Sequence, residues 1–324
     1  MRASARRQAS ILDMPEILLI KTSSLGDIIH EMPALTEARA QRPDARFSWV
    51  VEEAYAPLVR LHPAAAEVIP VATRRWRRTL YSPSTWGEMR AFKRTLRGRA
   101  YDEVIDTQGL IRTGLIAKLA SGRRHGYDAQ SIKEPFASRF YDVRHAVSRD
   151  MHAIARNRML TGRALGYIAD GPADYGLTRR AHPAPHAVLL HATARPEKLW
   201  PEEHWLEIGR ALSRRGIEVV LPWGTENERA RSDRLALALP DARVPPRQTL
   251  DRTAQLIAGA ALVVGVDTGL LHLAAAFGVP LVAIFTGSEP ALTGPRGAGP
   301  MEILGNNGAP PTATNVLEAV ERVV

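Results

Sequence analysis

Several residue types and patterns are missing from this chain, and each absence narrows its class. The 324 residues include no cysteine, which excludes disulfides, thiolate metal sites and cysteine nucleophiles and fits a reducing compartment. No run approaches the roughly 18 apolar residues that a membrane-spanning helix needs. Residues 1–13 are basic but have no apolar core of a signal peptide. We expect them to be a disordered extension, with Met14 as an alternative start.

Several common site motifs are also missing. Neither the dinucleotide fingerprint GxGxxG nor the P-loop pattern GxxxxGK[ST] occurs. There is no D-x-D pair and no convincing cluster of His and carboxylate ligands, so no metal is expected. Nothing resembles an RRM, a helix-turn-helix or a zinc finger, so nucleic acid is not the expected partner.

What the chain has in excess is positive charge. Lys and Arg number 43 against 34 Asp and Glu, a net charge of +9. Phosphorylated small molecules and anionic membrane surfaces are the partners that this excess favours. A merely arginine-rich solvated surface explains the same excess equally well.

Apolar strands alternate with helices in both halves of the chain. The expected strands are 15–21, 47–51, 67–71 and 101–106, then 186–191, 217–222, 261–266, 280–285 and 301–304. Alternation of this kind predicts parallel sheets with helices on both faces. We expect an α/β protein of two facing doubly wound, Rossmann-like domains, residues 1–172 and 173–324. The final helix, 312–324, is left open to pack on either domain. Ligands of such domains bind beyond the carboxyl ends of the strands, hence in the cleft between the two.

The stretch 263–285, VVGVDTGLLHLAAAFGVPLVAIF, reads as strand, DTG turn, helix and strand. The backbone N–H groups at the start of that helix, on Thr268 and Gly269, suit an anion such as a pyrophosphate. Asp267 would repel that anion, so it is expected to cap the helix or to accept hydrogen bonds from sugar hydroxyls. A lone histidine on an apolar helix, His272, more often belongs to the core than to a ligand site.

The loop after the first strand, KTSSLGDIIHE, carries two carboxylates. Asp27 begins the following helix and is a candidate base for an acceptor hydroxyl. The spacing from Ser24 to Asp27 equally fits a capping box, which spacing alone favours. Glu31, one turn later, is the alternative carboxylate. Lys21, Ser23 and Ser24 are candidate hydrogen-bond donors to a phosphate, although a lysine at a strand end is often merely solvated. Ser23 and Ser24 are expected to contact the acceptor.

Two further strand-end loops carry polar residues. After strand 186–191 come Thr193 and Lys198, and a lysine there neutralises charge on a departing diphosphate; a surface role is equally consistent. After strand 217–222 come Glu226 and Glu228, which suit either ribose hydroxyls or the start of a helix.

Two segments concentrate basic residues. The run TRRWRR places four arginines around an indole: Arg74, Arg75, Trp76, Arg77 and Arg78. A second basic stretch covers 122–149. Such segments bind phosphorylated acceptors or lipid headgroups, and as often are solvated faces.

With these loops in order, the chain resembles the lipopolysaccharide heptosyltransferases of the ADP-heptose glycosyltransferase family, most closely their type I members. The resemblance rests on ILLIKTSSLGDIIHEMPAL, WVVEEAY, VIPVATRRWRR, YDEVIDTQGL, KLWPEEHW, LPWG and VDTGLLHLAAA. It implies a GT-B fold, with the acceptor domain first and the nucleotide-sugar domain second. It also implies metal-free, inverting transfer of L-glycero-D-manno-heptose from ADP-heptose to Kdo of Kdo2-lipid A.

The resemblance assigns roles to individual residues. Asp27 matches the base, Lys198 the essential lysine, and TRRWRR a segment that meets acidic groups of the acceptor. The matched donor contacts are Thr193, Glu228, Asp267, Thr268, Gly269 and His272. Two positions near the donor depart from the type I pattern: Ala194 replaces a second threonine, and Gln248 replaces a methionine.

We expect a cytoplasmic enzyme, monomeric, without cofactor and peripheral on the inner face of the inner membrane. Three alternatives remain open. They are a type II or other family member with a different acceptor, a GT-B-like nucleotide-sugar epimerase, and a non-catalytic phosphate- or lipid-binding protein.

Overall fold

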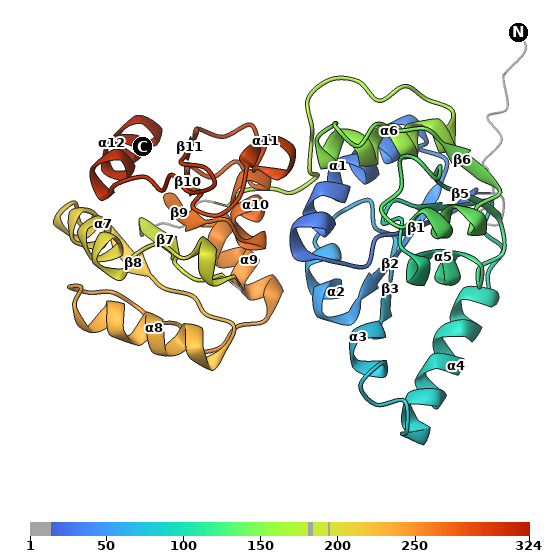
Figure 1. Cartoon of the computed structure of the whole chain (residues 1–324), viewed down its shortest axis with the longest axis horizontal. Helices are drawn as coiled ribbons and strands as arrows, with labels where there is room; N and C mark the ends of the chain where they lie inside the picture. The colour runs from blue at the N-terminus through green and yellow to red at the C-terminus, as the bar shows by residue number, and fades with distance from the viewer. Residues whose placement is uncertain (1–13, 181–183, 194) are drawn as a thin grey trace, which may run out of the picture.

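The computed structural model describes residues 14–180, 184–193 and 195–324. The expected disordered extension at 1–13 and the donor candidate Ala194 therefore lie outside the described residues. Figure 1 shows two lobes side by side, each built around its own sheet.

The first lobe holds a six-stranded parallel sheet in the order β3-β2-β1-β4-β5-β6. Its strands are β1 (Glu16–Ile20), β2 (Arg46–Glu52), β3 (Glu67–Val71), β4 (Glu103–Asp106), β5 (Arg123–Tyr127) and β6 (Val143–His145). Its helices are α1 (Leu25–Gln41), α2 (Ala56–Val59), α3 (Thr73–Trp76), α4 (Pro83–Arg97), α5 (Ile111–Ala117) and α6 (Ala153–Leu165). Short 3-10 turns occur at η2 (Glu53–Tyr55) and η3 (Pro135–Phe140).

The second lobe holds a five-stranded parallel sheet in the order β11-β10-β9-β7-β8. Its strands are β7 (His186–Leu190), β8 (Glu218–Val220), β9 (Leu262–Val266), β10 (Leu281–Ile284) and β11 (Met301–Leu304). Its helices are α7 (Glu202–Arg214), α8 (Glu226–Leu237), α9 (Leu250–Ala258), α10 (Gly269–Ala276), α11 (Pro290–Thr293) and α12 (Ala313–Val323), with a 3-10 turn at η4 (Pro196–Lys198). The prediction of two doubly wound parallel sheets is confirmed.

Both faces of each sheet are buried, because successive side chains of a strand point to opposite faces. In β1, Ile17 and Leu19 pack under α1, α2 and α6, while Leu18 and Ile20 pack under α3, α4 and α5. In the second lobe one face packs against α9 and α10, and the other against α7, α8 and α12.

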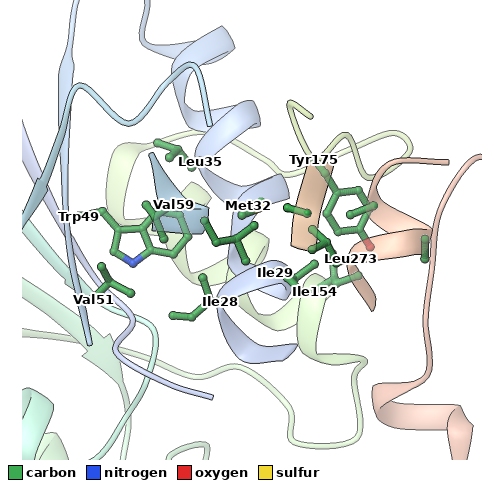
Figure 2. Packing of buried hydrophobic residues seen from close by; sticks show 14 of the residues in the cluster. Ile28, Ile29, Met32, Leu35, Trp49, Val51, Val59, Ile154, Tyr175 and Leu273 are labelled. Carbon is green, nitrogen blue, oxygen red and sulfur yellow. The ribbon is translucent and has the colours of Figure 1, made fainter. Parts of the chain in front are cut away.

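One hydrophobic cluster continues from the first lobe into the second. Met32 and Ile29 of α1 belong to the same cluster as Leu273 of α10. Figure 2 shows α1 between Trp49 on one side and Tyr175 and Leu273 on the other. The hydroxyl of Tyr175, on the segment that joins α6 to β7, donates a 2.6 Å hydrogen bond to the carbonyl of Arg296. The two lobes are therefore packed against each other through α1.

The structure corrects one expectation about the chain and decides one alternative that was left open. Strands β5 and β6 lie within the stretch interpreted only as a basic segment. Strand β5 begins with two arginines, and the second of them, Arg124, pairs with Asp142 at 2.6 Å. These charged residues obscure the apolar alternation of a strand. The last helix, α12, whose packing the sequence left open, packs into the core of the second lobe through Val316, Ala319 and Val320.

Candidate functional site

The loop after β1 is held in place by hydrogen bonds of its buried side chains. The Nζ atom of Lys21 is buried and donates to the Thr107 carbonyl at 2.8 Å and to Asn157 Oδ1 at 3.2 Å. Lys21 is thus part of the domain core. Ser23 is also buried, and its hydroxyl accepts a 2.8 Å hydrogen bond from Arg112. Ser24, the second predicted acceptor contact, is exposed.

Asp27 caps α1. Its Oδ2 atom accepts from the Ser24 amide at 2.6 Å and from the Ser24 hydroxyl at 3.1 Å. The capping interpretation, favoured by spacing, is confirmed. The carboxylate is half-buried, and Oδ1 has no hydrogen-bond partner within the described part of the chain. One oxygen therefore positions the side chain while the other stays available.

Glu31 cannot replace Asp27 at the cleft surface, which corrects the prediction of an alternative carboxylate. Its side chain is fully buried, and Oε2 accepts a 2.7 Å hydrogen bond from the Thr107 hydroxyl. Burial raises the pKa of Glu31 to about 7, although the positive charge of Lys21 and the hydrogen bond from Thr107 act in the opposite direction.

In the second lobe, three strand-end loops meet at Asp267. Its carboxylate forms an ion pair with Lys198, which follows β7, and accepts a 2.6 Å hydrogen bond from Ser288, which follows β10. Burial alone would raise the pKa of Asp267, but the hydrogen bonds from Lys198 and Ser288 hold it below its usual value. The Thr193 hydroxyl donates to the Asp267 carbonyl at 3.3 Å.

Of the two roles expected for Asp267, a helix cap or a contact to sugar hydroxyls, the helix cap is wrong. Thr268 is the N-cap residue of α10, and among the described residues no side chain caps the start of this helix. The carboxylate of Asp267 is instead held by Lys198. The first amides of α10, beginning at Gly269, are therefore left without a side-chain cap, which suits an anion.

Two roles were predicted for Glu228, a contact to ribose hydroxyls and the start of a helix, and its hydrogen bonds are those of a helix start. Its Oε2 atom accepts from the Gly224 amide at 2.7 Å and from the Thr225 amide at 3.2 Å. This is the capping box of α8, so the helix-start interpretation is confirmed. Glu226, in the first turn of the same helix, is exposed.

A cavity of about 320 Å³ lies at the carboxyl ends of the second sheet. Four predicted donor contacts line it together: Thr193, Glu228, Gln248 and Thr268. Trp223, Leu250 and Leu270 add apolar surface, and Leu25 lines it from the first lobe. Leu25 begins α1, two residues before Asp27, so this cavity is formed by both domains.

His272 does not line this cavity. It is buried where the lobes meet, with Nδ1 3.3 Å from Nε2 of His30 on α1. Burial lowers its pKa to about 4, so the ring is neutral at neutral pH. A third ring, His152, lies 5.5 Å from His30 between ring centres. The core interpretation of His272 is confirmed.

The basic segment TRRWRR, residues 73–78, contains α3, and only some of its side chains are free of hydrogen bonds and ion pairs in the described part of the chain. Trp76 is buried against Phe92, and its indole N–H donates to Glu88 at 2.7 Å. This corrects its prediction as an acceptor contact. Arg75 is held by Glu53 and Glu88 at 2.9 Å each, and the guanidinium of Arg74 bonds to Tyr55. Arg77 and Arg78 are exposed and form no ion pair within the described residues.

Four residues of the site were not predicted from the sequence: Gln108, Arg112, Trp223 and Ser288. Ser288 and Trp223 follow strands β10 and β8, so the rule that placed Thr193 would have found them. Gln108 accepts from the amides of Thr22 and Ser23 at 3.1 Å each, across 86 and 85 residues of sequence, which no local pattern reveals.

Comparison with known proteins identifies the family. The family model for glycosyltransferase family 9 (heptosyltransferase) matches residues 89–318. The lipopolysaccharide heptosyltransferase 1 of Pseudomonas aeruginosa is 46% identical over 288 residues, 87% of this chain and 81% of that protein. This chain belongs to glycosyltransferase family 9, the heptosyltransferases. As a family 9 enzyme it is a glycosyltransferase of lipopolysaccharide synthesis, which decides against the epimerase and the non-catalytic alternatives.

Comparison with heptosyltransferases 1 and 2 shows which of these two types of family 9 enzyme the chain is more similar to. The type 1 enzyme of E. coli K12 is 41% identical over 293 residues, 88% of this chain and 92% of that protein. The type 2 enzyme of the same strain is 23% identical over 320 residues, 86% and 85% of the two chains. The similarity is therefore to type 1.

A solved structure of E. coli heptosyltransferase WaaC with ADP superposes with a TM-score of 0.90 at 39% identity, covering 95% of this chain and 100% of that chain. This similarity confirms the GT-B fold of the family 9 chain. The described residues contain no helix that is long and apolar enough to cross a bilayer. Among the same residues, no group of three or more His, Asp or Glu side chains is arranged to hold a metal ion.

The raised pKa of Glu31 predicts a pH-dependent stability. The folded state holds this proton up to about pH 7, and the unfolded chain releases it near 4.5. The protonated carboxyl therefore favours folding below pH 4.5, and this contribution is lost as the pH rises through 7. Between pH 4.5 and 7, the free energy of unfolding of the wild type should fall by on the order of 3 kcal/mol relative to that of Glu31→Gln.

Urea unfolding of both proteins at a series of pH values measures that difference. Glu318→Gln, the same change on the exposed face of α12, is the control and should show no pH-dependent difference. A constant difference between Glu31→Gln and wild type would contradict the prediction.

Proposed function

We propose that this enzyme transfers L-glycero-D-manno-heptose from ADP-heptose to a Kdo residue of Kdo2-lipid A, with inversion and without a metal ion. The observation that carries the proposal is the cavity lined by Thr193, Glu228, Gln248 and Thr268, with Leu25 of the first lobe on its wall. Solved structures of E. coli WaaC contain ADP or ADP-2-deoxy-2-fluoro heptose. A nucleotide sugar in this cavity would place its reacting carbon toward α1.

The second lobe supplies positive charge for the leaving group. The uncapped amides of α10 begin at Gly269, and Lys198 is held beside them by Asp267. We propose that the diphosphate approaches these amides and that Lys198 turns from Asp267 toward it. Preorganised donors at developing charge contribute most where water is excluded. The cation role that a metal plays in other transferases then falls to Lys198.

The first lobe supplies the acceptor side. The Kdo hydroxyl oxygen attacks the anomeric carbon of the heptose from the face opposite the diphosphate. Its proton passes to Asp27 Oδ1, the bond from the anomeric carbon to the diphosphate oxygen breaks, and ADP leaves with the electron pair. Ser24, Arg77 and Arg78 are proposed to meet the acidic groups of the acceptor.

The lipid nature of this acceptor places the enzyme on the inner face of the inner membrane. We propose a cytoplasmic, peripheral and monomeric enzyme whose basic first domain faces the lipid headgroups. Arg77 and Arg78 are the described members of TRRWRR that remain free to do so.

Release of ADP from ADP-heptose, measured with and without Kdo2-lipid A, tests the function. We expect release only with that acceptor, together with formation of the heptosylated lipid. Release with an acceptor that already carries one heptose, and none with Kdo2-lipid A, would instead indicate a type II enzyme.

Asp27→Asn should bind ADP-heptose normally and transfer it at least about a hundredfold more slowly, because a positioned base contributes 10²–10⁴-fold. The asparagine oxygen can still accept from the Ser24 amide, so α1 should remain capped. Calorimetric titration of the donor and the steady-state rate separate the two effects, and the thermal midpoint checks the fold. Near-normal turnover would leave Asp27 with its capping role alone.

Lys198→Ala should weaken ADP-heptose binding and lower kcat by about 10²–10³, the effect of losing one donor at developing charge. Lys118→Ala, which removes an exposed lysine at the end of α5, is the matched control and should leave both constants unchanged. Unchanged kinetics in Lys198→Ala would exclude this lysine from the diphosphate site.

A further inference from the structure

Helices α3 and α4 extend from the first lobe as an arm, and the turn that joins them forms its tip (Figure 1). Three large apolar side chains are exposed near this tip. Leu80 is 48% exposed, Tyr81 86% and Trp86 47%. Residues 73–97 are called the arm below.

The tip is a formed structure. The indole N–H of Trp86 donates to the Leu80 carbonyl at 2.8 Å, which joins the first turn of α4 to the end of the connection from α3. The hydroxyls of Thr79 and Thr85 are 2.8 Å apart and close the same turn. Because the one polar atom of the Trp86 ring is satisfied, the exposed part of the ring is its apolar body.

Four cations follow the tip along the exposed face of α4. Arg90, Lys93, Arg94 and Arg97 lie at helical spacings of three and four residues, which continue the row that begins at Trp86. All four are exposed, and none forms an ion pair within the described residues. The one acidic residue of α4, Glu88, is taken up by Arg75 and Trp76.

We propose that the arm docks the enzyme on an anionic phospholipid bilayer, with Tyr81 and Trp86 at the headgroup level and the row of α4 cations along the surface. The proposal rests on the function above, because a lipid acceptor requires the enzyme to reach a membrane. Aromatic side chains with a polar edge favour the membrane–water interface. Each basic residue near an anionic surface adds about 1 kcal/mol.

The arrangement favours a lipid surface over a protein or a nucleic acid. The inner side of α4 is already used, since Phe92 and Leu96 are buried in the core. The exposed part of the arm consists of an ordered apolar tip and, apart from it, the row of unpaired α4 cations. A bilayer matches both parts, with an apolar layer beneath a sheet of negative charge. The arm also carries Arg77 and Arg78, so docking would bring the proposed acceptor contacts to the headgroups.

Binding of the full chain to vesicles without Kdo2-lipid A tests the docking surface independently of catalysis. Vesicles of equimolar phosphatidylethanolamine and phosphatidylglycerol should bind the enzyme, and phosphatidylcholine vesicles much less. Arg90→Gln with Arg94→Gln should reduce the partition coefficient about tenfold or more. The control is Arg210→Gln with Arg214→Gln, the same change at the same spacing on the exposed face of α7, and should change it less than about twofold.

Quenching of tryptophan fluorescence by brominated lipid tests the tip. The wild type should be quenched by the anionic vesicles, and Trp86→Phe should lose most of that quenching. Trp49, Trp200 and Trp205 are buried and supply an unquenched background.

In the vesicle experiments, three outcomes would overturn the proposal: no binding to anionic vesicles, an equal loss in the α4 and α7 variants, or quenching that survives Trp86→Phe. Stronger binding to single-stranded RNA than to vesicles would also overturn it.

Transfer assays separate this proposal from the proposed function. The α4 variant should transfer heptose normally to a deacylated, soluble Kdo acceptor and more slowly to Kdo2-lipid A in vesicles. If the wild type transfers to neither acceptor yet binds vesicles through the arm, the proposed function fails and the docking surface stands. Equal rates on vesicles for the α4 variant and wild type would show that docking does not serve transfer.

Discussion

The close approach of α1 to α10 is the contact on which the site depends. A Cβ atom added to Gly269 would lie 2.7 Å from Leu25, and one added to Gly26 would lie 3.3 Å from the His272 ring. Glycine at both positions lets the two helix starts meet. Each helix follows a central strand of its own sheet, so the meeting joins the carboxyl edges of both sheets. Leu25 can therefore line a cavity that is otherwise built by the second lobe.

Some polar residues around this contact stabilise the local structure, and others are proposed to take part in the reaction. Glu228 and one oxygen of Asp27 cap helices, and Asp267 holds Lys198. His30 and His272, buried between the lobes, have lowered pKa values and remain neutral. Lys198 and Asp27 lie on different domains, and we propose that they face the diphosphate and the acceptor in the cleft.

Much of the fold was predictable because its strands are buried on both faces and read as short apolar runs. Strand β3 was predicted with its observed bounds, and β11 likewise. Strands β5 and β6 were missed because arginine and histidine interrupt their apolar pattern: β5 begins with Arg123 and Arg124, and β6 is the edge strand of the sheet. The same limit applies to side chains: whether Trp76 is buried, or whether Glu31 reaches the cleft, depends on neighbours far away in the sequence.

The sequence by itself determined the two parallel sheets, the strand-end loops that carry Asp27, Thr193 and Lys198, and the family resemblance that relatives at 41–46% identity confirmed. Local spacing also predicted the capping box of Asp27, because a cap involves residues only three or four positions apart, and it placed Glu228 at the start of a helix. Tertiary structure alone decided that Lys198 pairs with Asp267 across 69 residues and that His30 meets His272 across 242. Those contacts depend on how the loops and the two lobes meet in space, which no short window of sequence encodes.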